Sequence, residues 1–270
     1  GDDWQDQKKG VLRSISPKGE YVGLCSGTLI NNTSFDQDPL FLSAFHCYEG
    51  VTEEEINQTV YYFNYEYEGC ENLGTDPYSK TITGAEYLVS LPISANSDGA
   101  LLRLSRQIPD NYDAYFNGWD RRNSPAISGV CIHHPAGDVK KISTFKSPAT
   151  STTWRAQGVT GATNGYWNVY FSKTETGHSV TEGGSSGSPL FNQNKLVVGT
   201  LTGGSSTCNY KNGVNNYGKL WYHWDKSTEG KYMADYLDPT GTGEEYIPGF
   251  YNGATPFEAD FSYAPEEVVV

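Results

Sequence analysis

The apolar residues of this chain come in many short runs, and this division limits the possible folds more than any other feature of the sequence. Runs at 59–65, 85–91, 166–171 and 196–201 are alternating or wholly apolar and are bounded by Gly, Asn, Asp or Pro. Such runs are typical of short β-strands joined by tight turns. Twenty tyrosines, thirty glycines and a single methionine also favour strands and turns over helices. The sequence therefore predicts an all-β protein with two packed barrels.

Residues 183–189 read Gly-Gly-Ser-Ser-Gly-Ser-Pro and have little side chain to pack. We expect a tight, exposed turn between two strands that carries a reactive hydroxyl on Ser186. Glycine at position 184 allows backbone conformations closed to other residues, so that the N–H groups of Gly184 and Ser186 can point at one oxyanion. Because a serine is a weak nucleophile without a base, the rest of the chain must supply a histidine and a group that orients it.

Among the five histidines, His46 is the best candidate, since the apolar run 41–47 ends with His46 and Cys47. The others are adjacent to one another or lie in polar or aromatic surroundings without repeated spacing: His133, His134, His178 and His223. Asp98 is the best candidate for the orienting carboxylate because the short apolar run 99–104 follows it directly.

A metal site is not expected around His46. Residues 46 and 47 are neighbours on a predicted strand and so point to opposite faces, and no second ligand is suitably spaced. We expect His133 and His134 to be structural rather than metal ligands. No cofactor is expected either.

The chain order His46, Asp98, Ser186 is that of the triad in chymotrypsin-like serine proteases, and the segments around these residues resemble the three motifs of that family. The similarity is greater to its bacterial lysyl endopeptidase branch and extends from about residue 5 to about residue 250. It rests on six segments: 25–32, 118–122, 132–135, 181–189, 203–208 and 237–239.

This resemblance implies two packed six-stranded antiparallel β-barrels with a short C-terminal helix, for which 230–237 is the candidate. His46 and Asp98 would come from the first barrel, at about 1–110, and Ser186 from the second, at about 118–240. Together they would form a protease domain over residues 1–250. Residues 251–270 are expected to be a linker, because 258–265 resembles the first strand of an immunoglobulin-like module that the chain does not complete. A disordered tail is the alternative.

The resemblance also implies a secreted serine endopeptidase that acts on peptides or proteins. His46 would accept the Ser186 proton, Asp98 would orient His46, and the N–H groups of Gly184 and Ser186 would bind the oxyanion. Related enzymes that mature by N-terminal insertion carry an aspartate directly before the nucleophile. Ser185 stands there, so that switch is not expected. A protease-fold binding protein without activity is the second functional class, and the intact triad argues against it.

Substrate selection is where the sequence departs from the lysyl endopeptidases. They hold the P1 lysine with an aspartate two residues before Tyr-Gly, and Asn215 stands at that position. A neutral amide does not offset the desolvation of an ammonium as a carboxylate does. We expect an uncharged or polar P1 side chain; a Lys/Arg preference would need Glu182 or another acid to reach the pocket. The resemblance places the following residues at the pocket: Trp154, Val180, Thr181, Thr202, Gly203 and Asn215.

The five cysteines are an odd number. The resemblance implies a disulfide between Cys25 and Cys47. It pairs Cys70 and Cys208 with cysteines upstream of residue 1, so these two either hold a cleaved N-terminal peptide or stay free. Cys131 is expected to be a buried thiol. Disulfides point to a secreted or cell-surface bacterial protein.

The net charge argues against nucleic-acid and membrane partners. A net charge of −13 with only 19 Lys and Arg leaves no basic stripe for a nucleic acid and disfavours acidic membrane surfaces. No apolar run approaches the roughly 18 residues that span a bilayer. Residues 1–10 are too polar for a signal peptide, so for a secreted protein we expect the targeting segment to have been removed or left out of this sequence.

Overall fold

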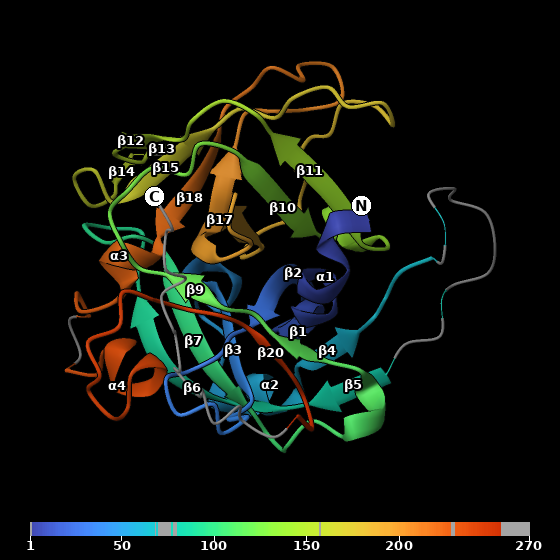
Figure 1. Cartoon of the computed structure of the whole chain (residues 1–270), viewed down its shortest axis with the longest axis vertical. Coiled ribbons are helices and arrows are strands. Elements are labelled where there is room, and N and C mark those ends of the chain that lie inside the picture. The colour runs from blue at the N-terminus through green and yellow to red at the C-terminus, as the bar shows by residue number, and fades with distance from the viewer. Residues whose placement is uncertain are drawn as a thin grey trace, which may run out of the picture.

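A computed structural model describes residues 2–67, 69, 77, 80–156, 158–227 and 230–254. Their strands form two main sheets, seen in the lower and upper halves of Figure 1. Neighbouring strands are antiparallel except for one parallel bridge between β9 (Trp119–Asp120) and β17 (Val197–Gly204). The all-β, two-barrel architecture is confirmed.

The first sheet has the strand order β5-β4-β1-β2-β3-β7-β6. Its strands are β1 (Val11–Lys18), β2 (Tyr21–Leu29), β3 (Leu40–Ala44), β4 (Val60–Phe63), β5 (Lys80–Thr83), β6 (Ala85–Leu91) and β7 (Gly99–Leu104). The two strands at opposite ends of this order, β5 and β6, are separated in the chain by Gly84 alone. They are therefore one bent strand whose halves pair with β4 and β7, which closes the sheet into a barrel of six strands.

Gly84 is the residue that allows this bend. Its φ is +87°, which L-residues with a side chain rarely adopt, and a Cβ there would lie 2.9 Å from the carbonyl oxygen of Asn57. Its N–H donates to Thr59 O at 2.8 Å and its carbonyl accepts from the N–H of Ser105 at 3.0 Å. The bend is thus hydrogen-bonded on both sides.

The second sheet follows the same plan, with the order β11-β10-β16-β17-β18-β15-β12. Its further strands are β10 (Gly129–His133), β11 (Lys141–Phe145), β12 (Thr150–Thr152), β15 (Tyr166–Val169), β16 (Pro189–Asn192) and β18 (Asn215–Lys219). The edge strands β11 and β12 are consecutive in the chain and separated by residues 146–149, which include Pro148. Together β11 and β12 form one interrupted strand that occupies both ends of this strand order, so this barrel also has six strands.

Short strand pairs lie outside the two barrels. They are β8 (Tyr115–Phe116) with β20 (Phe250–Tyr251), β9 with β19 (Tyr246–Ile247), and the hairpin of β13 (Arg155–Ala156) and β14 (Val159–Thr160). Through β19 and β20, the end of the described chain is attached to the segment that connects the barrels.

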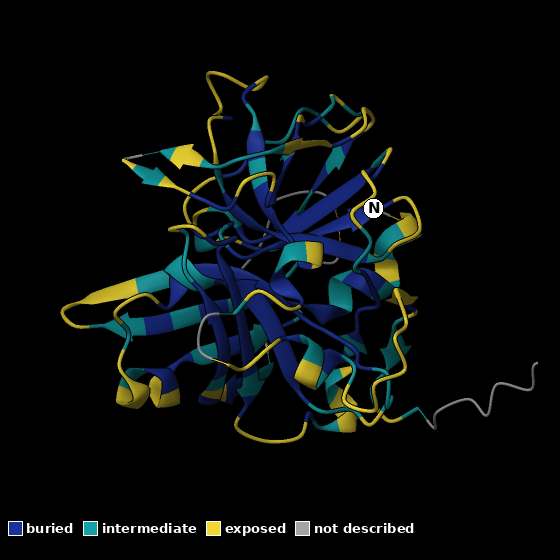
Figure 2. Ribbon diagram, turned by 90° about the vertical axis from the view of Figure 1, so that its left-hand side faces the viewer, coloured by how far each residue is buried: buried dark blue, intermediate teal, exposed yellow. Residues whose placement is uncertain are grey.

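Several strands are buried on both faces, which explains their continuous apolar runs. In β3, Phe41 packs inside the first barrel, whereas its neighbours Leu40 and Leu42 pack in the interface between barrels. In β16, Leu190 lies inside the second barrel and Phe191 faces the same interface. Successive side chains of a strand alternate in direction, so both neighbours need a buried environment. Figure 2 shows the central strands as largely buried and the turns as exposed.

The helices are short: α1 (Gln5–Gly10), α2 (Glu53–Gln58), α3 (Leu220–His223) and α4 (Ala234–Leu237), with 3₁₀ turns at Asp2–Trp4, Phe45–Cys47, Asp110–Tyr112 and Pro135–Gly137. The expected C-terminal helix is present, but it begins at Ala234 rather than near 230. Helix α2 was not expected. It has a capping box, in which Thr52 and Glu55 bond each other's backbone N–H groups.

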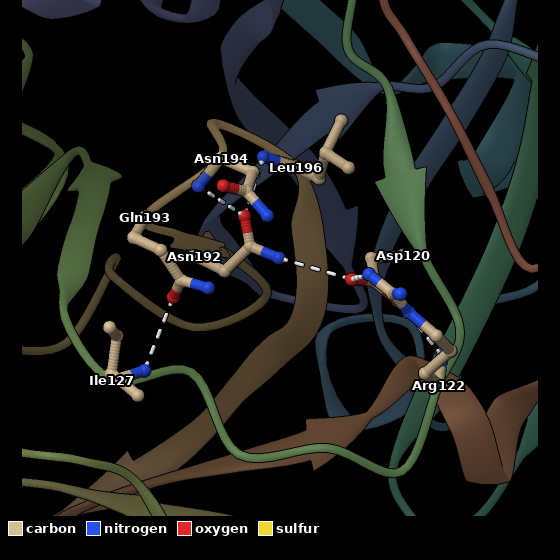
Figure 3. Close-up of polar contacts among 7 residues, drawn as sticks. All are labelled: Asp120, Arg122, Ile127, Asn192, Gln193, Asn194 and Leu196. Carbon is tan, nitrogen blue, oxygen red and sulfur yellow. Dashed lines mark hydrogen bonds and ion pairs between the residues drawn. The ribbon is translucent and has the colours of Figure 1, made fainter. Parts of the chain in front are cut away.

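A polar cluster fixes the turn between β16 and β17 to the connection between the barrels (Figure 3). Asn192 Oδ1 accepts from the N–H groups of Asn194 and Leu196, while its Nδ2 donates to Asp120 Oδ2 at 3.3 Å. Asp120 also pairs with Arg122. Within the described residues, no helix is long and apolar enough to cross a membrane.

Candidate active site

His46 and Asp98 are brought together by the pairing of β3 with β7. Ala44 lies opposite Gly99 in this pairing, so the residues just beyond each strand end are neighbours. The chain then turns at residues 45–47 as a 3₁₀ helix, so the expectation that residues 46 and 47 lie on a strand is wrong. Cys47 of this turn forms a disulfide with Cys25 of β2. This disulfide, which the resemblance implied, anchors the turn that carries His46.

Asp98 holds His46 through both carboxylate oxygens. Oδ1 accepts from the backbone N–H of His46 at 2.9 Å, and Oδ2 lies 2.7 Å from its Nδ1. The Asp98 side chain is fully buried, whereas a quarter of the His46 side chain (25%) is exposed. The imidazole is therefore fixed by a carboxylate at Nδ1 and is partly open to solvent.

The charge balance around His46 favours its protonated form. Burial alone lowers the pKa of the imidazole, but the charge and hydrogen bond of Asp98 together raise it above its ordinary value. The carboxylate of Glu49 raises it further, and the ammonium of Lys18 opposes this effect. A raised pKa makes His46 a stronger base once it is neutral.

Ser186 lies on the second barrel, in the turn before β16, and this turn packs against the first barrel. The N–H of Ser26 donates to Ser186 O at 2.8 Å. A Cβ on Gly187 would lie 2.1 Å from Ser43 Oγ and 2.9 Å from Ala44 N. Ser186 thus adjoins the strand end that carries His46. Its hydroxyl makes no hydrogen bond within the described part of the chain.

The expectation of an exposed turn is wrong for most of 183–189. Only Gly183 is exposed, Ser186 is half-buried, and the others are buried. The physical reason is the contact with the first barrel, where Ser26 Oγ donates to Gly184 O at 2.8 Å. The turn is consequently a packed element rather than a free loop.

Two backbone donors of this turn are left free. The N–H groups of Ser185 and Gly187 donate to Glu182 O and Leu201 O. Those of Gly184 and Ser186 donate to no atom of the described ranges, and Gly184 has the left-handed φ of +92° that its sequence position suggested. Such free N–H groups beside a serine are suited to bind a developing negative charge.

A family model described as the C-terminal domain of lysyl endopeptidase matches residues 1–219. The chain belongs to the lysyl endopeptidase family. Its sequence is 33% identical over 208 residues to a lysyl endopeptidase of Pseudomonas aeruginosa, an alignment that covers 74% of this chain. The chain spans only about 41% of the length of that relative.

Solved structures show the same fold at low sequence identity. A protease from M. tuberculosis in its active form has a TM-score of 0.50 and 15% identity, covering 80% of this chain and 78% of that one. A thermostable serine protease from an extremophilic microorganism has a TM-score of 0.54 and 14% identity, covering 80% and 93%. This member of the lysyl endopeptidase family thus has the fold of the chymotrypsin-like serine proteases.

The residues predicted from the lysyl endopeptidase family to bind P1 come together only in part. Asn215 Oδ1 accepts from the hydroxyls of Thr181 and Ser206, each at 2.7 Å. The ring of Trp154 lies against Gly203, where an added Cβ would be 3.2 Å away. Val180 is half-buried.

The predicted pocket residue Thr202 is 6% exposed, and its hydroxyl has no hydrogen-bond partner among the described residues. Glu182, one acid that would have to reach the pocket for a Lys/Arg preference, is exposed.

His223 supports the site and was missed by the sequence reasoning. It is fully buried between the barrels, with Nδ1 2.7 Å from Ser97 Oγ and Nε2 3.1 Å from Thr200 Oγ1. Burial lowers its pKa to about 3. A side chain at Gly99 would clash with its ring at 2.6 Å. No local signal marks this residue, because its partners lie far along the chain.

The remaining cysteines differ in exposure. Cys131 is a free, fully buried thiol, as expected, and burial raises its pKa to about 11. Cys208 is free and exposed, with its sulfur 3.8 Å from Glu182 Oε1. Cys70 lies outside the described residues. Within those residues, no three His, Cys, Asp or Glu side chains gather as metal ligands.

Proposed function

We propose that this chain is the peptidase unit of a secreted serine endopeptidase. The observation that carries the proposal is the double contact of buried Asp98 with His46, next to the turn that presents Ser186. Membership in the lysyl endopeptidase family and the serine protease fold support it.

In this proposal His46 accepts the Ser186 proton through Nε2 while Ser186 Oγ attacks the carbonyl carbon of the scissile bond. The N–H groups of Gly184 and Ser186 stabilise the oxyanion of the tetrahedral intermediate. His46 then protonates the leaving amine, and the acyl-enzyme forms. Water, deprotonated by the same imidazole, releases the acid product and restores Ser186.

An activity-based probe tests the nucleophile. A fluorophosphonate should label the wild-type chain, and Ser186→Ala should abolish the labelling. Ser188→Ala, which removes a buried hydroxyl two residues away, is the matched control and should keep it. A folded wild-type chain that is not labelled would instead favour a binding protein without activity.

We further propose that P1 is an uncharged or polar side chain rather than strictly lysine. Asn215 is fully buried, and its oxygen already accepts two hydroxyl hydrogen bonds. Its amide carries no charge to compensate a lysine ammonium. Digestion of a peptide library and identification of the P1 residues tests this proposal, which consistent cleavage after lysine would contradict.

Secretion fits the Cys25–Cys47 disulfide, because such bonds persist in oxidising compartments. The exposed thiol of Cys208 fits our proposal that Cys70 and Cys208 bind an N-terminal peptide through disulfides. Intact mass before and after reduction tests this.

We keep the domain proposal of a protease unit to about residue 250, with barrels at about 1–110 and 118–240. In the linker proposed for 251–270, Tyr251 pairs with Tyr115 and the N–H of Asn252 donates to Ala114 O, so its first residues pack on the protease unit. Residues 255–270 lie outside the described part, and the proposal for them rests on sequence alone.

A further inference from the structure

We propose that His133 is a positioning residue. Through the hydroxyl of Ser185 it holds the turn at 183–189, which carries the N–H groups proposed to bind the oxyanion. The inference rests on the proposed function. It assigns a role to a buried histidine that takes no part in the chemistry described above. It also gives Ser185, which directly precedes the proposed nucleophile, a partner within the second barrel.

The contacts form a short, directional chain. His133, at the end of β10, has Nδ1 2.8 Å from Ser185 Oγ and Nε2 2.9 Å from Ser143 Oγ on β11. Ser185 Oγ also accepts from the N–H of Glu182 at 3.1 Å. Ser185 Oγ keeps its own proton and a second lone pair for the contact with His133 Nδ1. A neutral imidazole donates at one ring nitrogen and accepts at the other, so it can bond both serine hydroxyls at once.

Burial keeps the imidazole neutral. His133 is 1% exposed, and Ser185 and Ser143 are fully buried. Burial, with a smaller contribution from the charge of Lys141, lowers the pKa of His133 to about 3. No buried charge is therefore involved, in contrast to an ion pair with an inserted amino terminus.

The contact acts on the turn at the position that matters for an oxyanion. Ser185 lies between Gly184 and Ser186, the two residues of the turn whose N–H groups have no acceptor among the described residues. The other side of the turn is fixed by Ser26, which donates its hydroxyl to Gly184 O and its N–H to Ser186 O, each at 2.8 Å. Ser26 thus holds the carbonyls of residues 184 and 186, and His133 holds the side chain of the residue between them. The 185–186 peptide, which carries the Ser186 N–H, is also held by the N–H of Ser188, which donates to Ser185 O at 3.1 Å.

Two substitutions of His133 separate positioning from packing. An asparagine carboxamide reaches about as far as Nδ1, so His133→Asn keeps a hydrogen-bond partner for Ser185. A glutamine reaches about as far as Nε2, so His133→Gln keeps the contact with Ser143 and loses the one with Ser185. Ser185→Ala removes the hydroxyl itself and little volume.

The assays are kcat and KM for a chromogenic peptide substrate, and the Ki of a peptide aldehyde that forms a tetrahedral adduct. Removal of one oxyanion donor costs roughly 10²–10³-fold in kcat, so a misplaced donor should cost about 10- to 100-fold. We expect this loss in kcat for Ser185→Ala and His133→Gln, with KM within about twofold and aldehyde affinity weakened in proportion. His133→Asn should keep most of the wild-type kcat and aldehyde affinity.

Equal losses in His133→Asn and His133→Gln would overturn the inference, because they would reflect packing alone. An unchanged kcat and aldehyde affinity in Ser185→Ala would also overturn it. A wild-type chain that neither turns over substrate nor reacts with a fluorophosphonate would instead refute the proposed function.

Discussion

The replacement of Asp98 by asparagine should inactivate this protein without unfolding it, because the orientation of the new amide is dictated by the backbone. Oδ1 accepts from the N–H of His46 at 2.9 Å, so the amide oxygen must take that place. The amide NH₂ then faces His46 Nδ1, where Oδ2 lay at 2.7 Å. It donates to that nitrogen and moves the ring proton to Nε2. The nitrogen that should accept the Ser186 proton thus becomes a donor.

The expected loss follows from this change of tautomer. Similar geometry in other serine proteases suggests a fall in kcat of roughly 10⁴-fold, which corresponds to about 5 kcal/mol at about 1.36 kcal/mol per tenfold. The acid limb of the pH profile should also move. In the wild type, activity should fall as pH drops through a His46 pKa that lies above 6.5. Without the Asp98 charge, burial dominates, and the residual activity should persist to lower pH.

The assay is kcat/KM for a peptide ester between pH 5 and pH 9, with thermal denaturation to verify that the Asp98→Asn variant is folded. A folded variant within about tenfold of wild type, or an acid limb that does not move downward, would refute the argument from hydrogen-bond direction.

Three further outcomes are expected. Asn215→Asp should raise kcat/KM for P1 lysine relative to P1 glutamine by about tenfold or more, because a charged hydrogen bond is worth about 1.5–3 kcal/mol. Matched peptide anilides measure this ratio, and an unchanged ratio would mean that residue 215 does not reach P1. Gly84→Ala should lower the free energy of unfolding by about 1–3 kcal/mol, since φ is +87° and the new Cβ would lie 2.9 Å from Asn57 O. A loss below about 0.5 kcal/mol in urea denaturation would contradict the expected backbone strain. Replacing Cys25 and Cys47 together by serine should cost about 3 kcal/mol, because their disulfide closes a loop of 22 residues; an unchanged midpoint in urea would exclude that contribution.

The sequence predicted the parts of the site that local patterns mark. His46 lies just beyond the apolar strand β3 and Asp98 just before β7, and the pairing of these strands makes the two residues neighbours. The disulfide of Cys25 with Cys47 came from the family resemblance. These features could be found because each is tied to a short segment whose strand character is evident.

The features that sequence reasoning missed depend on contacts between distant segments. His223 bonds Ser97, 126 residues away, and His133 bonds Ser185 at a separation of 52. The turn around Ser186 looked exposed because its residues are small, yet small residues also permit close packing. Helix α2 was a different kind of miss, since Thr52 and Glu55 do form a recognisable start signal.

The bend at Gly84 has a consequence for how the protein meets other polypeptides. An open sheet presents a row of unpaired backbone groups to which a foreign strand can add. In the first barrel both outer rows belong to one strand that bends at Gly84, and its halves β5 and β6 are only four and seven residues long. Short, bent edges are poor templates for a further strand, so this barrel offers extended peptides no long straight edge.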